Sequence, residues 1–360
     1  MVACVTNGET SSSPTRVSAD QFNWEASSGI AAGVRRVVEA ATEADGRSPL
    51  NEQTLLSLRH DGLSASTLWI SLRHWSPKRV ADAPVGGPMS EGQAEVAGFA
   101  LVDRQPGAAE IEMNLVVHPD RREEGVGSTL ATAVLEEFGS ARISAWSHGN
   151  HAAAAAWASR IGFSRIRALW IMRLPLTPPS VLNRQSVGVE PSVGGGRAAK
   201  NYVIRTFEPG RDEAAVLEVN AAAFADHPEQ GEMTRADLDQ RMAEPWFDPA
   251  GFFVAESESG ELLGFHWTKV HLAEGVEPAY GEVYVVGISP DAQGMGLGKQ
   301  LTLTGLQHLE SLGLGEVILY VESDNAAAIA VYQGLGFTHA AEDTDVMYAR
   351  EQPDGSTPTT

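Results

Sequence analysis

Cysteine is almost absent from this sequence of 360 residues, which contains only Cys4, in a polar N-terminal stretch. A single cysteine excludes an internal disulfide and argues against a thiolate metal site or a positioned cysteine nucleophile. Long apolar runs are absent as well, so no segment has the length needed to span a bilayer. The first residues have neither a basic region nor an apolar core, the two marks of a signal peptide. We therefore expect a cytoplasmic protein.

Basic residues are scarce: 26 Lys and Arg stand against 47 Asp and Glu, and the formal net charge is −21. An acidic surface repels nucleic acid and anionic lipid unless a local basic patch overrides it, and the sequence contains no such patch. The same charge keeps a protein soluble and weakly favours a monomer. We therefore expect no nucleic-acid partner, no membrane partner and a monomeric state.

The chain is longer than one average domain, and its composition divides it in two. Residues 176–200 are dense in Pro, Gly and Ser and lack periodicity, which is typical of a linker. Residues 1–20 and 351–360 are polar, so we expect a disordered leader and a disordered tail. The remaining segments, 21–175 and 201–350, are the two predicted domains.

Both domains repeat one order of helices and strands, judged from apolar periodicity and turn residues. In the first domain the predicted strands are 66–75, 95–103, 110–119, 141–147 and 168–176, and the predicted helices are 29–44, 51–60, 127–139 and 151–163. In the second domain the predicted strands are 202–207, 251–257, 261–270, 281–289, 316–323 and 345–350, and the predicted helices are 212–224, 234–244, 299–313 and 325–336. The recurrence predicts an α/β fold with a mixed sheet that arose by internal duplication.

A glycine-rich loop, QGMGLGK (residues 293–299), connects a predicted strand to a predicted helix. Its G-x-G-x-G spacing lacks the Rossmann fingerprint, and it lacks the GK[ST] ending of a P-loop. Backbone amides without side chains at a helix N-terminus nevertheless form an anion site, and Lys299 adds a positive charge. Taken alone, the loop is either a phosphate site or only a turn.

Two motifs together resemble a known family. The loop, read as Gln293-x-x-Gly296-x-Gly298, is similar to the Q/R-x-x-G-x-G/A pyrophosphate loop of the GCN5-related N-acetyltransferases (GNAT). Residues 325–337 resemble the second GNAT signature, a helix opened by Asn that carries a Tyr before a Gly-Phe ending. Most of both halves is similar to the mycothiol synthase family of tandem acetyltransferases, especially HPEQG, EPWFDP, LLGFHWTKVH, GEVYVVGISP and LYVESDN. The resemblance implies two tandem GNAT-like domains.

The resemblance also implies a reaction. Acetyl-CoA is the implied co-substrate, and the implied small-molecule acceptor is cysteinyl-glucosaminyl-inositol, whose cysteine α-amine is acetylated to give mycothiol and CoA. Two alternatives stay open: a GNAT enzyme for another small amine, a drug or a protein N-terminus, and a catalytically idle acetyl-CoA sensor. No metal is expected, because His227, His266 and His271 lack metal-ligand spacing, and the latter two lie in or near a strand with no clustered partners.

Acetyl transfer needs a neutral amine, a polarised thioester carbonyl and a proton for the leaving thiolate. The resemblance implies that Glu282 is the general base and Tyr332 the general acid. An α-amine has an ordinary pKa of about 8, so a modest base suffices, and a phenol with an ordinary pKa near 10 stays protonated at neutral pH. The competing interpretations are a solvated strand-end carboxylate for Glu282 and core packing for Tyr332. The presence of both residues in one half argues against the sensor.

Cofactor contacts are predicted on a strand, a loop and a helix. Backbone groups of Val286, Gly287 and Ile288 could pair with the pantetheine arm, and one N–H could face the carbonyl oxygen, with Gly287 permitting a close approach or a bulge. The other predicted contacts are Gln293, Gly294, Met295, Gly296, Leu297, Gly298 and Lys299 in the loop. The resemblance also implies contacts from Asn325, Ala326, Ala327, Ala328, Ile329 and Ala330 in the helix.

For the acceptor, the resemblance points to Glu52, Glu229, Lys269, Tyr320 and Glu282. Carboxylates, an ammonium and a phenol suit a ligand rich in hydroxyl groups. Glu52 has a competing local role, because Asn51 can cap the following helix and acidic residues are common in a first turn.

The first domain preserves only part of the site. Its loop keeps R-x-x-G-x-G at residues 122–127, but Glu123 and Glu124 would repel a pyrophosphate. In the alignment of the two loops, Glu282 corresponds to Ile111, and Tyr332 corresponds to Trp157 or Ala158. None of these can act as an acid or a base at neutral pH. We expect a non-catalytic first domain, and acetyl-CoA binding there, around Leu115, Val116 and Val117, stays open.

Overall fold

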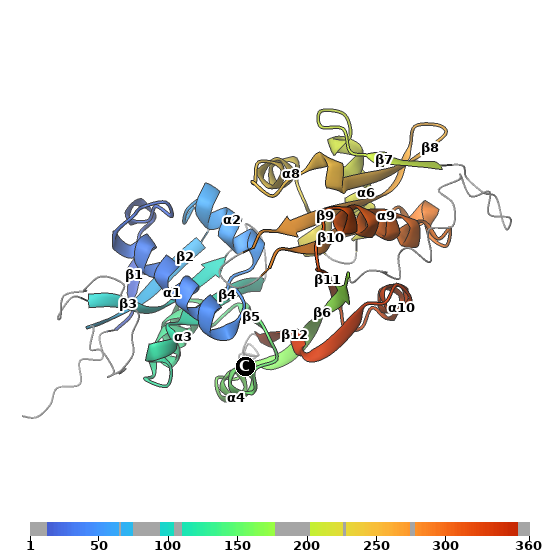
Figure 1. Cartoon of the computed structure of the whole chain (residues 1–360). Helices are drawn as coiled ribbons and strands as arrows, with labels where there is room; N and C mark the ends of the chain where they lie inside the picture. Colours follow the sequence, from blue (N-terminus) through green and yellow to red (C-terminus); the bar gives the residue numbers. More distant parts are fainter. Residues whose placement is uncertain are drawn as a thin grey trace, which may run out of the picture. The chain divides into compact units, whose positions relative to one another are not determined.

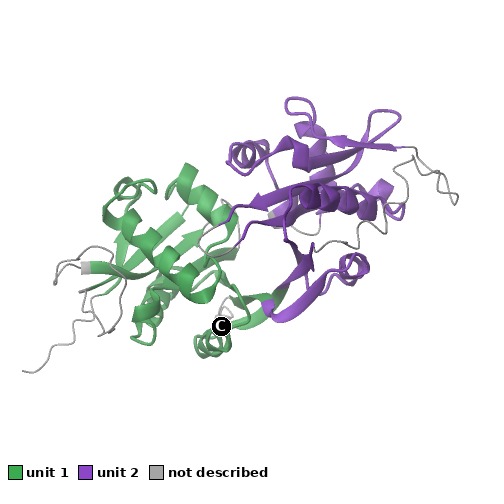
Figure 2. Ribbon diagram, in the orientation of Figure 1, with its two compact units in different colours: residues 1–168, 344–360 green, residues 169–343 purple. Residues whose placement is uncertain are grey.

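A computed structural model describes residues 13–64, 66–74, 94–103, 110–176, 202–225, 228–273 and 278–351. They form two compact units, unit 1 with residues 1–168 and 344–360 and unit 2 with residues 169–343 (Figure 2). Cys4, most of the predicted linker and most of the predicted tail lie outside the described residues. The predicted domain limits therefore stay a prediction.

Unit 1 is a mixed α/β unit with strand order β1-β2-β3-β4-β5-β12, in which the β4–β5 pair is parallel (Figure 1). Its elements are β1 (Thr15–Val17), η1 (Ala19–Gln21), α1 (Gly29–Asp45), α2 (Glu52–His60), β2 (Ser66–His74), β3 (Ala94–Asp103), β4 (Glu110–Val117), η2 (Pro119–Arg121), α3 (Val126–Phe138), β5 (Arg142–Ser147) and α4 (Ala152–Arg160). The disordered leader predicted for residues 1–20 is too long, because residues 15–17 form β1 and pair with β2.

Unit 2 has the strand order β6-β11-β10-β9-β8-β7, in which the β10–β11 pair is parallel. Its elements are β7 (Tyr202–Thr206), α6 (Glu213–Ala223), α7 (Pro228–Gly231), α8 (Arg235–Met242), η3 (Pro249–Gly251), β8 (Phe252–Ser257), β9 (Leu262–His271), β10 (Tyr280–Ile288), η4 (Pro290–Ala292), α9 (Leu297–Ser311), β11 (Glu316–Glu322) and α10 (Ala326–Gly334). The predicted mixed α/β fold class is therefore observed.

Each unit is completed by a strand end from the other half of the sequence. Strand β6 (Ser164–Pro175) ends in unit 2, where residues 169–175 pair with β11. Strand β12 (Thr338–Arg350) ends in unit 1, where residues 346–350 pair with β5. The predicted boundary in the linker does not anticipate this exchange.

Helices cover both faces of the unit 2 sheet. Leu238 of α8 and Val216 of α6 pack with Trp267 of β9 on one face, which we call the α6 face. Leu306 of α9 packs with Val283 of β10 on the opposite face, which we call the α9 face, and α10 belongs to the same cluster. Successive strand residues point to opposite faces, and this alternation separates the two cores.

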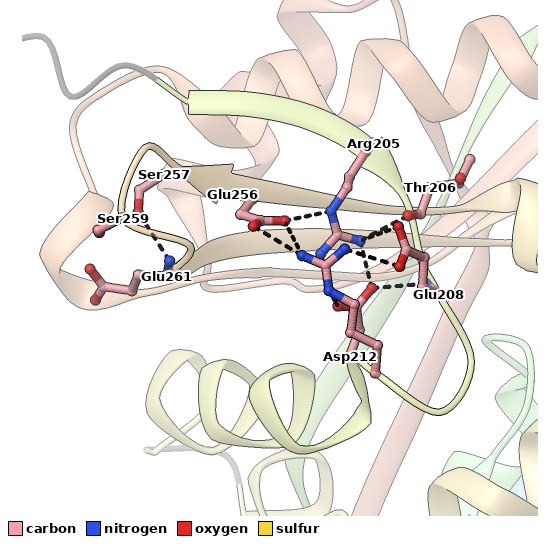
Figure 3. Close-up of polar contacts among 9 residues, drawn as sticks. Arg205, Thr206, Glu208, Asp212, Glu256, Ser257, Ser259 and Glu261 are labelled. Carbon is pink, nitrogen blue, oxygen red and sulfur yellow. Dashed lines mark hydrogen bonds and ion pairs between the residues drawn. The ribbon is translucent and has the colours of Figure 1, made fainter.

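An ion-pair network joins β7 and β8 of unit 2 to the start of α6 (Figure 3). Arg205 of β7 donates two hydrogen bonds to Asp212, of 2.6 and 2.9 Å, and a third to Glu256 of β8. Asp212 also accepts the backbone N–H of Glu208 at 2.8 Å and is only 2% exposed. Burial by itself would raise the pKa of Asp212, but the hydrogen bonds from Arg205 and Glu208 bring it below its ordinary value. The network holds the start of α6 against the sheet.

Candidate functional site

The strands β10 and β11 separate at the centre of unit 2. Their parallel pairing covers residues 281–283 of β10, whereas the pairing of β10 with β9 continues to Ile288. In the described part of the chain, residues 285–288 therefore have no strand partner on the β11 side. Backbone groups there are available to a ligand, because buried N–H and C=O groups need a partner. This opening contains the predicted cofactor residues Val286, Gly287 and Ile288.

The irregularity in β10 lies at Tyr284. The register with β9 shifts between Val283 and Val285, whereas Gly287 pairs regularly with Phe265. Of the two alternatives for Gly287, a close approach or a bulge, the bulge is not found at this residue. A Cβ at Gly287 would lie 2.5 Å from Cε1 of Phe265, so glycine is needed there to accommodate the aromatic ring.

The glycine loop gives α9 an open N-terminus. Gly294 and Gly296 have φ angles of 78° and 74°, in the left-handed region that favours glycine, and Gly296 is the N-cap of α9. The helix begins at Leu297, two residues before the predicted start, because this cap precedes it. A Cβ at either glycine would meet no atom within 4 Å, so the space beside the loop is open.

Backbone rather than side chains of the loop faces that space. Leu297 is buried in a core cluster, and Met295 packs against the same cluster, so these two residues can contact a ligand mainly through their amides. Gln293 and Lys299 are exposed, and Gly298 is half-buried. The first N–H groups of a helix lack intrahelical partners and lie at the positive end of its dipole. The loop therefore offers backbone N–H groups to a ligand, and anion binding there stays a prediction.

Helix α10 presents a surface of small residues. The Asn325 side chain accepts the backbone N–H of Ala328 at 3.0 Å and so caps the helix. Ala326, Ala327 and Ala330 are exposed, whereas Ile329 is buried in the core. Of the predicted contacts, Ile329 is therefore the one whose side chain serves packing.

Tyr332 is a half-buried phenol on α10. Its ring packs edge-on against Phe337, with 5.9 Å between ring centroids. Burial raises the pKa of Tyr332 to about 12 from the ordinary 10.0. Its hydroxyl has no hydrogen-bond partner among the described residues. The side chain therefore belongs to the core and keeps a proton that it can donate.

Glu282 is a buried carboxylate on β10, only 6% exposed. The competing interpretation of a solvated carboxylate is therefore wrong. Its Oε2 lies 2.6 Å from Nε2 of His271 on β9. The prediction that His271 has no clustered partner is also wrong, and sequence reasoning missed this residue. A signal was present, because His271 stands two positions after Lys269 and so shares its face of the strand.

Three predicted residues share the α6 face. Residues paired directly across two strands place their side chains on the same face. Glu282 pairs with Lys269 on one side and with Ile318 on the other. Tyr320 follows Ile318 by two positions and is 44% exposed. The register therefore gathers Glu282, Lys269 and Tyr320 on one face, while Tyr332 belongs to a helix of the other.

Two aromatic rings hold the Lys269 ammonium. Nζ of Lys269 lies 4.6 Å from the ring centroid of Trp246 and 5.3 Å from that of Tyr284. Nε of Arg241 donates a hydrogen bond of 3.0 Å to the Tyr284 hydroxyl. Cation–π contacts within about 6 Å are attractive, so the cage fixes the cation on the α6 face. Sequence reasoning did not include Trp246, Tyr284 or Arg241.

The other two predicted acceptor residues, Glu52 and Glu229, lie in other elements. Glu229 lies in α7, but its side chain is outside the described part of the structure. Glu52 opens α2 of unit 1, and the Asn51 side chain accepts the Thr54 N–H at 2.8 Å, as the local interpretation expects. A role for Glu52 and Glu229 with the acceptor stays a prediction.

His266 is a fully buried core histidine. Its Nδ1 lies 2.8 Å from the carbonyl oxygen of Leu301, and burial lowers its pKa to about 4 from the ordinary 6.5. Within the described residues, no group of three or more His, Cys, Asp or Glu side chains is arranged to hold a metal ion. None of the described helices is both long and apolar enough to cross a membrane.

Unit 1 repeats the shape of the site. Strand β4 pairs with β5 only over residues 110–112 in the described part, so Leu115, Val116 and Val117 lie beyond the point of separation. The loop again ends in an N-cap glycine, Gly125, with φ of 80°, and Glu123 has φ of 68° where unit 2 has Gly294.

The acid and base positions of unit 1 hold core residues instead. Ile111 and Ala158 are buried in one apolar cluster. The Trp157 indole N–H donates to Ser128 Oγ at 3.3 Å, and Arg122 makes two hydrogen bonds to Asp45, of 2.7 and 2.6 Å. Unit 1 thus has the strands and the loop without the titratable pair.

Glu123→Gly is expected to stabilise unit 1 by about 0.5–1 kcal/mol, because a left-handed backbone is strained for a residue with a Cβ. The midpoint of urea unfolding should rise accordingly. Glu124→Gly is the matched control. It removes the same charge at the neighbouring position, where the backbone φ is not positive. An equal or larger gain from Glu124→Gly would contradict the explanation by strain.

Comparisons with known proteins also divide the chain into two repeats. The pattern that defines the Acetyltransferase (GNAT) family matches residues 59–163 and 217–337. The mycothiol acetyltransferase of Thermobispora bispora is 48% identical over 319 residues, which cover 88% of this chain and 95% of that protein. The mycothiol acetyltransferase of Nocardioides sp. is 47% identical over 332 residues, which cover 89% of this chain and 98% of that protein.

Two solved structures share the fold. A tandem GNAT protein from the clavulanic acid biosynthesis pathway aligns with a TM-score of 0.60 at 22% identity, over 89% of this chain and 94% of that one. A GCN5-related N-acetyltransferase from Sphaerobacter thermophilus aligns with a TM-score of 0.58 at 21% identity, over 90% of this chain and 94% of that one. The predicted fold of two tandem GNAT-like repeats is confirmed.

Proposed function

This chain belongs to the GNAT acetyltransferases, and within them to the mycothiol acetyltransferase family; from that premise we propose that it acetylates the cysteine α-amine of cysteinyl-glucosaminyl-inositol with acetyl-CoA, giving mycothiol and CoA. One observation carries the proposal: unit 2 combines a buried carboxylate on β10, Glu282, with a protonated phenol, Tyr332, on the helix α10. The corresponding positions of unit 1 lack both groups, so we assign the reaction to unit 2.

The residues of unit 2 suit acetyl-CoA. The N-terminus of α9, with Gly294, Gly296 and Lys299, would hold the pyrophosphate. The unpaired backbone of residues 286–288 would hold the pantetheine arm, as a peptide adds to a sheet edge. The small exposed residues of α10 would lie along the remainder. When bound, acetyl-CoA supplies an acetyl group activated as a thioester.

Glu282 supplies the base. An α-amine has an ordinary pKa of about 8, so part of it is protonated at neutral pH and must lose a proton before it can attack. The carboxylate of Glu282 lies on the α6 face beside Lys269, where it can accept that proton directly or through one water. Backbone N–H groups of β10 beyond residue 283 can donate to the carbonyl oxygen as negative charge develops on it.

Tyr332 supplies the acid. Because its pKa is raised to about 12, the phenol is protonated throughout the physiological range. The CoA thiolate has to gain a proton as it departs, and the Tyr332 hydroxyl has no competing hydrogen bond in the described part of the chain. The base and the acid thus lie on opposite faces of one sheet. The amine can therefore give its proton to one residue while the thiolate takes its proton from the other.

Lys269 and Tyr320 are the proposed acceptor contacts nearest to Glu282. Both lie on its face, and an ammonium and a phenol can bind the hydroxyl groups of a glucosaminyl-inositol. The Trp246 and Tyr284 rings keep Lys269 in place, so its donors are oriented before the acceptor arrives. Glu52 and Glu229 complete the proposed set.

A thiol-release assay tests the function. The purified protein is incubated with acetyl-CoA and, in parallel, with cysteinyl-glucosaminyl-inositol, glucosaminyl-inositol or free cysteine, and each product is identified by mass. We expect acetylation of the first acceptor only. Equal transfer to free cysteine, or transfer only to another amine, would contradict the substrate assignment. Binding of acetyl-CoA without transfer to any amine would instead favour a sensor.

Tyr332→Phe is expected to lower kcat by about 10- to 100-fold, because the thiolate then leaves without a positioned acid. Affinity for acetyl-CoA, measured by calorimetry, should stay within about twofold, since the ring still packs against Phe337. Tyr348→Phe, a half-buried tyrosine of unit 1, is the control and should leave both quantities unchanged. A parallel fall of kcat and acetyl-CoA affinity would assign Tyr332 to packing.

A further inference from the structure

His271 is the polar partner of the proposed base. Its Nε2 lies 2.6 Å from Oε2 of Glu282, and the two residues stand on neighbouring strands. Neither the family resemblance nor the comparisons give His271 a role. The two side chains differ in exposure: that of Glu282 is 8% exposed, whereas that of His271 is 27% exposed.

The contact fixes the position of one hydrogen. An ionised carboxylate can only accept hydrogen bonds, so Nε2 of His271 must carry the hydrogen in this pair. Oε2 of Glu282 is thereby engaged. Oε1 has no other partner within the described residues, so it is the oxygen that can receive a further proton.

The histidine ring is itself held. It stacks on the Tyr280 ring, with 4.4 Å between centroids and 12° between planes. Tyr280 and His271 are directly paired across β10 and β9, as Glu282 and Lys269 are. Regular strand pairing therefore sets the ring plane, and the ring plane sets the direction of the Nε2–H.

We propose that His271 is a positioning residue of the reaction: its Nε2–H holds Oε2 of Glu282 and thereby directs Oε1 toward the amine whose proton it takes. This inference depends on the proposed function, because it assumes that Glu282 is the base. A carboxylate on a strand can rotate about its terminal torsions, and the hydrogen bond removes that freedom. Positioning of this kind acts on turnover and leaves ground-state binding of either substrate unchanged.

The test is His271→Phe, which keeps an aromatic ring on Tyr280 and removes the donor. We expect kcat to fall by about 10- to 100-fold, with KM for acetyl-CoA and for the acceptor within about twofold of native. His271→Gln, whose amide can donate to Glu282, should recover kcat to within about fivefold of native. If the Phe variant fails to fold, His271→Gln remains the test, and a kcat more than about fivefold below native would contradict the inference.

His339→Phe is the matched control. His339 also stacks on an aromatic ring, Trp170, with centroids 4.3 Å apart, and its Nδ1 lies 3.2 Å from the Ile171 carbonyl oxygen. The substitution likewise replaces a stacked histidine of unit 2 by phenylalanine, at a residue that is not part of the proposed site, and native kinetics are expected.

Three results would overturn the inference in distinguishable ways. Native kcat in His271→Phe, beside an inactive Glu282→Gln, refutes the role of His271 and leaves the proposed function intact. A rise in KM with unchanged kcat places His271 in substrate binding instead. A native enzyme that transfers no acetyl group, or a Glu282→Gln variant with native kcat, refutes the assumed base and with it the inference.

Discussion

Glu282→Gln is expected to lower kcat by about 10²- to 10⁴-fold at pH 7, the range that a positioned general base contributes. The amide keeps the volume of the buried side chain and can still accept the His271 N–H, so the loss measures proton removal. The rate should recover in part above about pH 8, where the α-amine deprotonates without help. Steady-state kinetics between pH 6 and pH 9 follow both changes.

Glu316→Gln is the control for Glu282→Gln. Glu316 is a carboxylate of the neighbouring strand β11, paired with Arg173 at 2.8 Å. The Glu316→Gln variant should retain native kcat at every pH. If Glu282→Gln keeps its activity at pH 7, Glu282 is not the base, and the amine must reach the site already neutral.

Arg205→Leu is expected to destabilise unit 2 by about 3–5 kcal/mol, the usual cost of leaving a buried charge without its partner. Asp212 is 2% exposed, and two of its hydrogen bonds come from Arg205 (Figure 3). Urea unfolding monitored by the fluorescence of the unit 2 tryptophans gives the change in free energy. Asp212→Asn, introduced into the Arg205→Leu variant, removes the buried charge that has lost its partner. It should recover part of the lost free energy of unfolding.

The pH dependence of the Arg205→Leu effect follows from the pKa of Asp212. In the folded protein this pKa lies below its ordinary value, so the carboxylate stabilises the fold above the pKa of the unfolded chain, about 4, and that stability is lost as the pH falls further. The difference in unfolding free energy between native protein and Arg205→Leu should therefore narrow on acidification from pH 7 to pH 3.

Arg211→Leu is the control for Arg205→Leu. Arg211 also reaches Glu208, Glu256 and Asp212, but its side chain is 51% exposed. Exposed ion pairs contribute about 0–1 kcal/mol, so the loss should be small. Equal losses from Arg205→Leu and Arg211→Leu would show that the network acts through total charge rather than through the buried pair.

Local patterns were sufficient to predict the fold class and the position of the glycine loop. Apolar periodicity located most helices and strands, and Gly294 and Gly296 marked the loop between β10 and α9 because their left-handed φ angles favour glycine. The assignment of Glu282 as the proposed base and Tyr332 as the proposed acid depended on the family resemblance, since neither residue type is diagnostic by itself in its position.

Contacts across strands could not be predicted. His271 and Glu282 are 11 positions apart, and their pairing depends on a register that a loop and an irregularity at Tyr284 determine. A shift of one residue moves every side chain of a strand to the opposite face, so a sequence pattern cannot say which polar residues meet. For the same reason, the contacts of Lys269 with the Trp246 and Tyr284 rings could not be predicted from the sequence.

The exchange of strand ends affects how the protein is made. Synthesis proceeds from the N-terminus, and a nascent chain usually folds one domain after another as it leaves the ribosome. Here β5 emerges early, but the residues that cover its edge, 346–350, follow the whole of unit 2 in the sequence. Unit 1 must therefore wait with an open strand edge until unit 2 has been translated, and an exposed edge is a template for aggregation. Halves produced separately would each carry the strand that the other requires, so neither would be a self-sufficient domain.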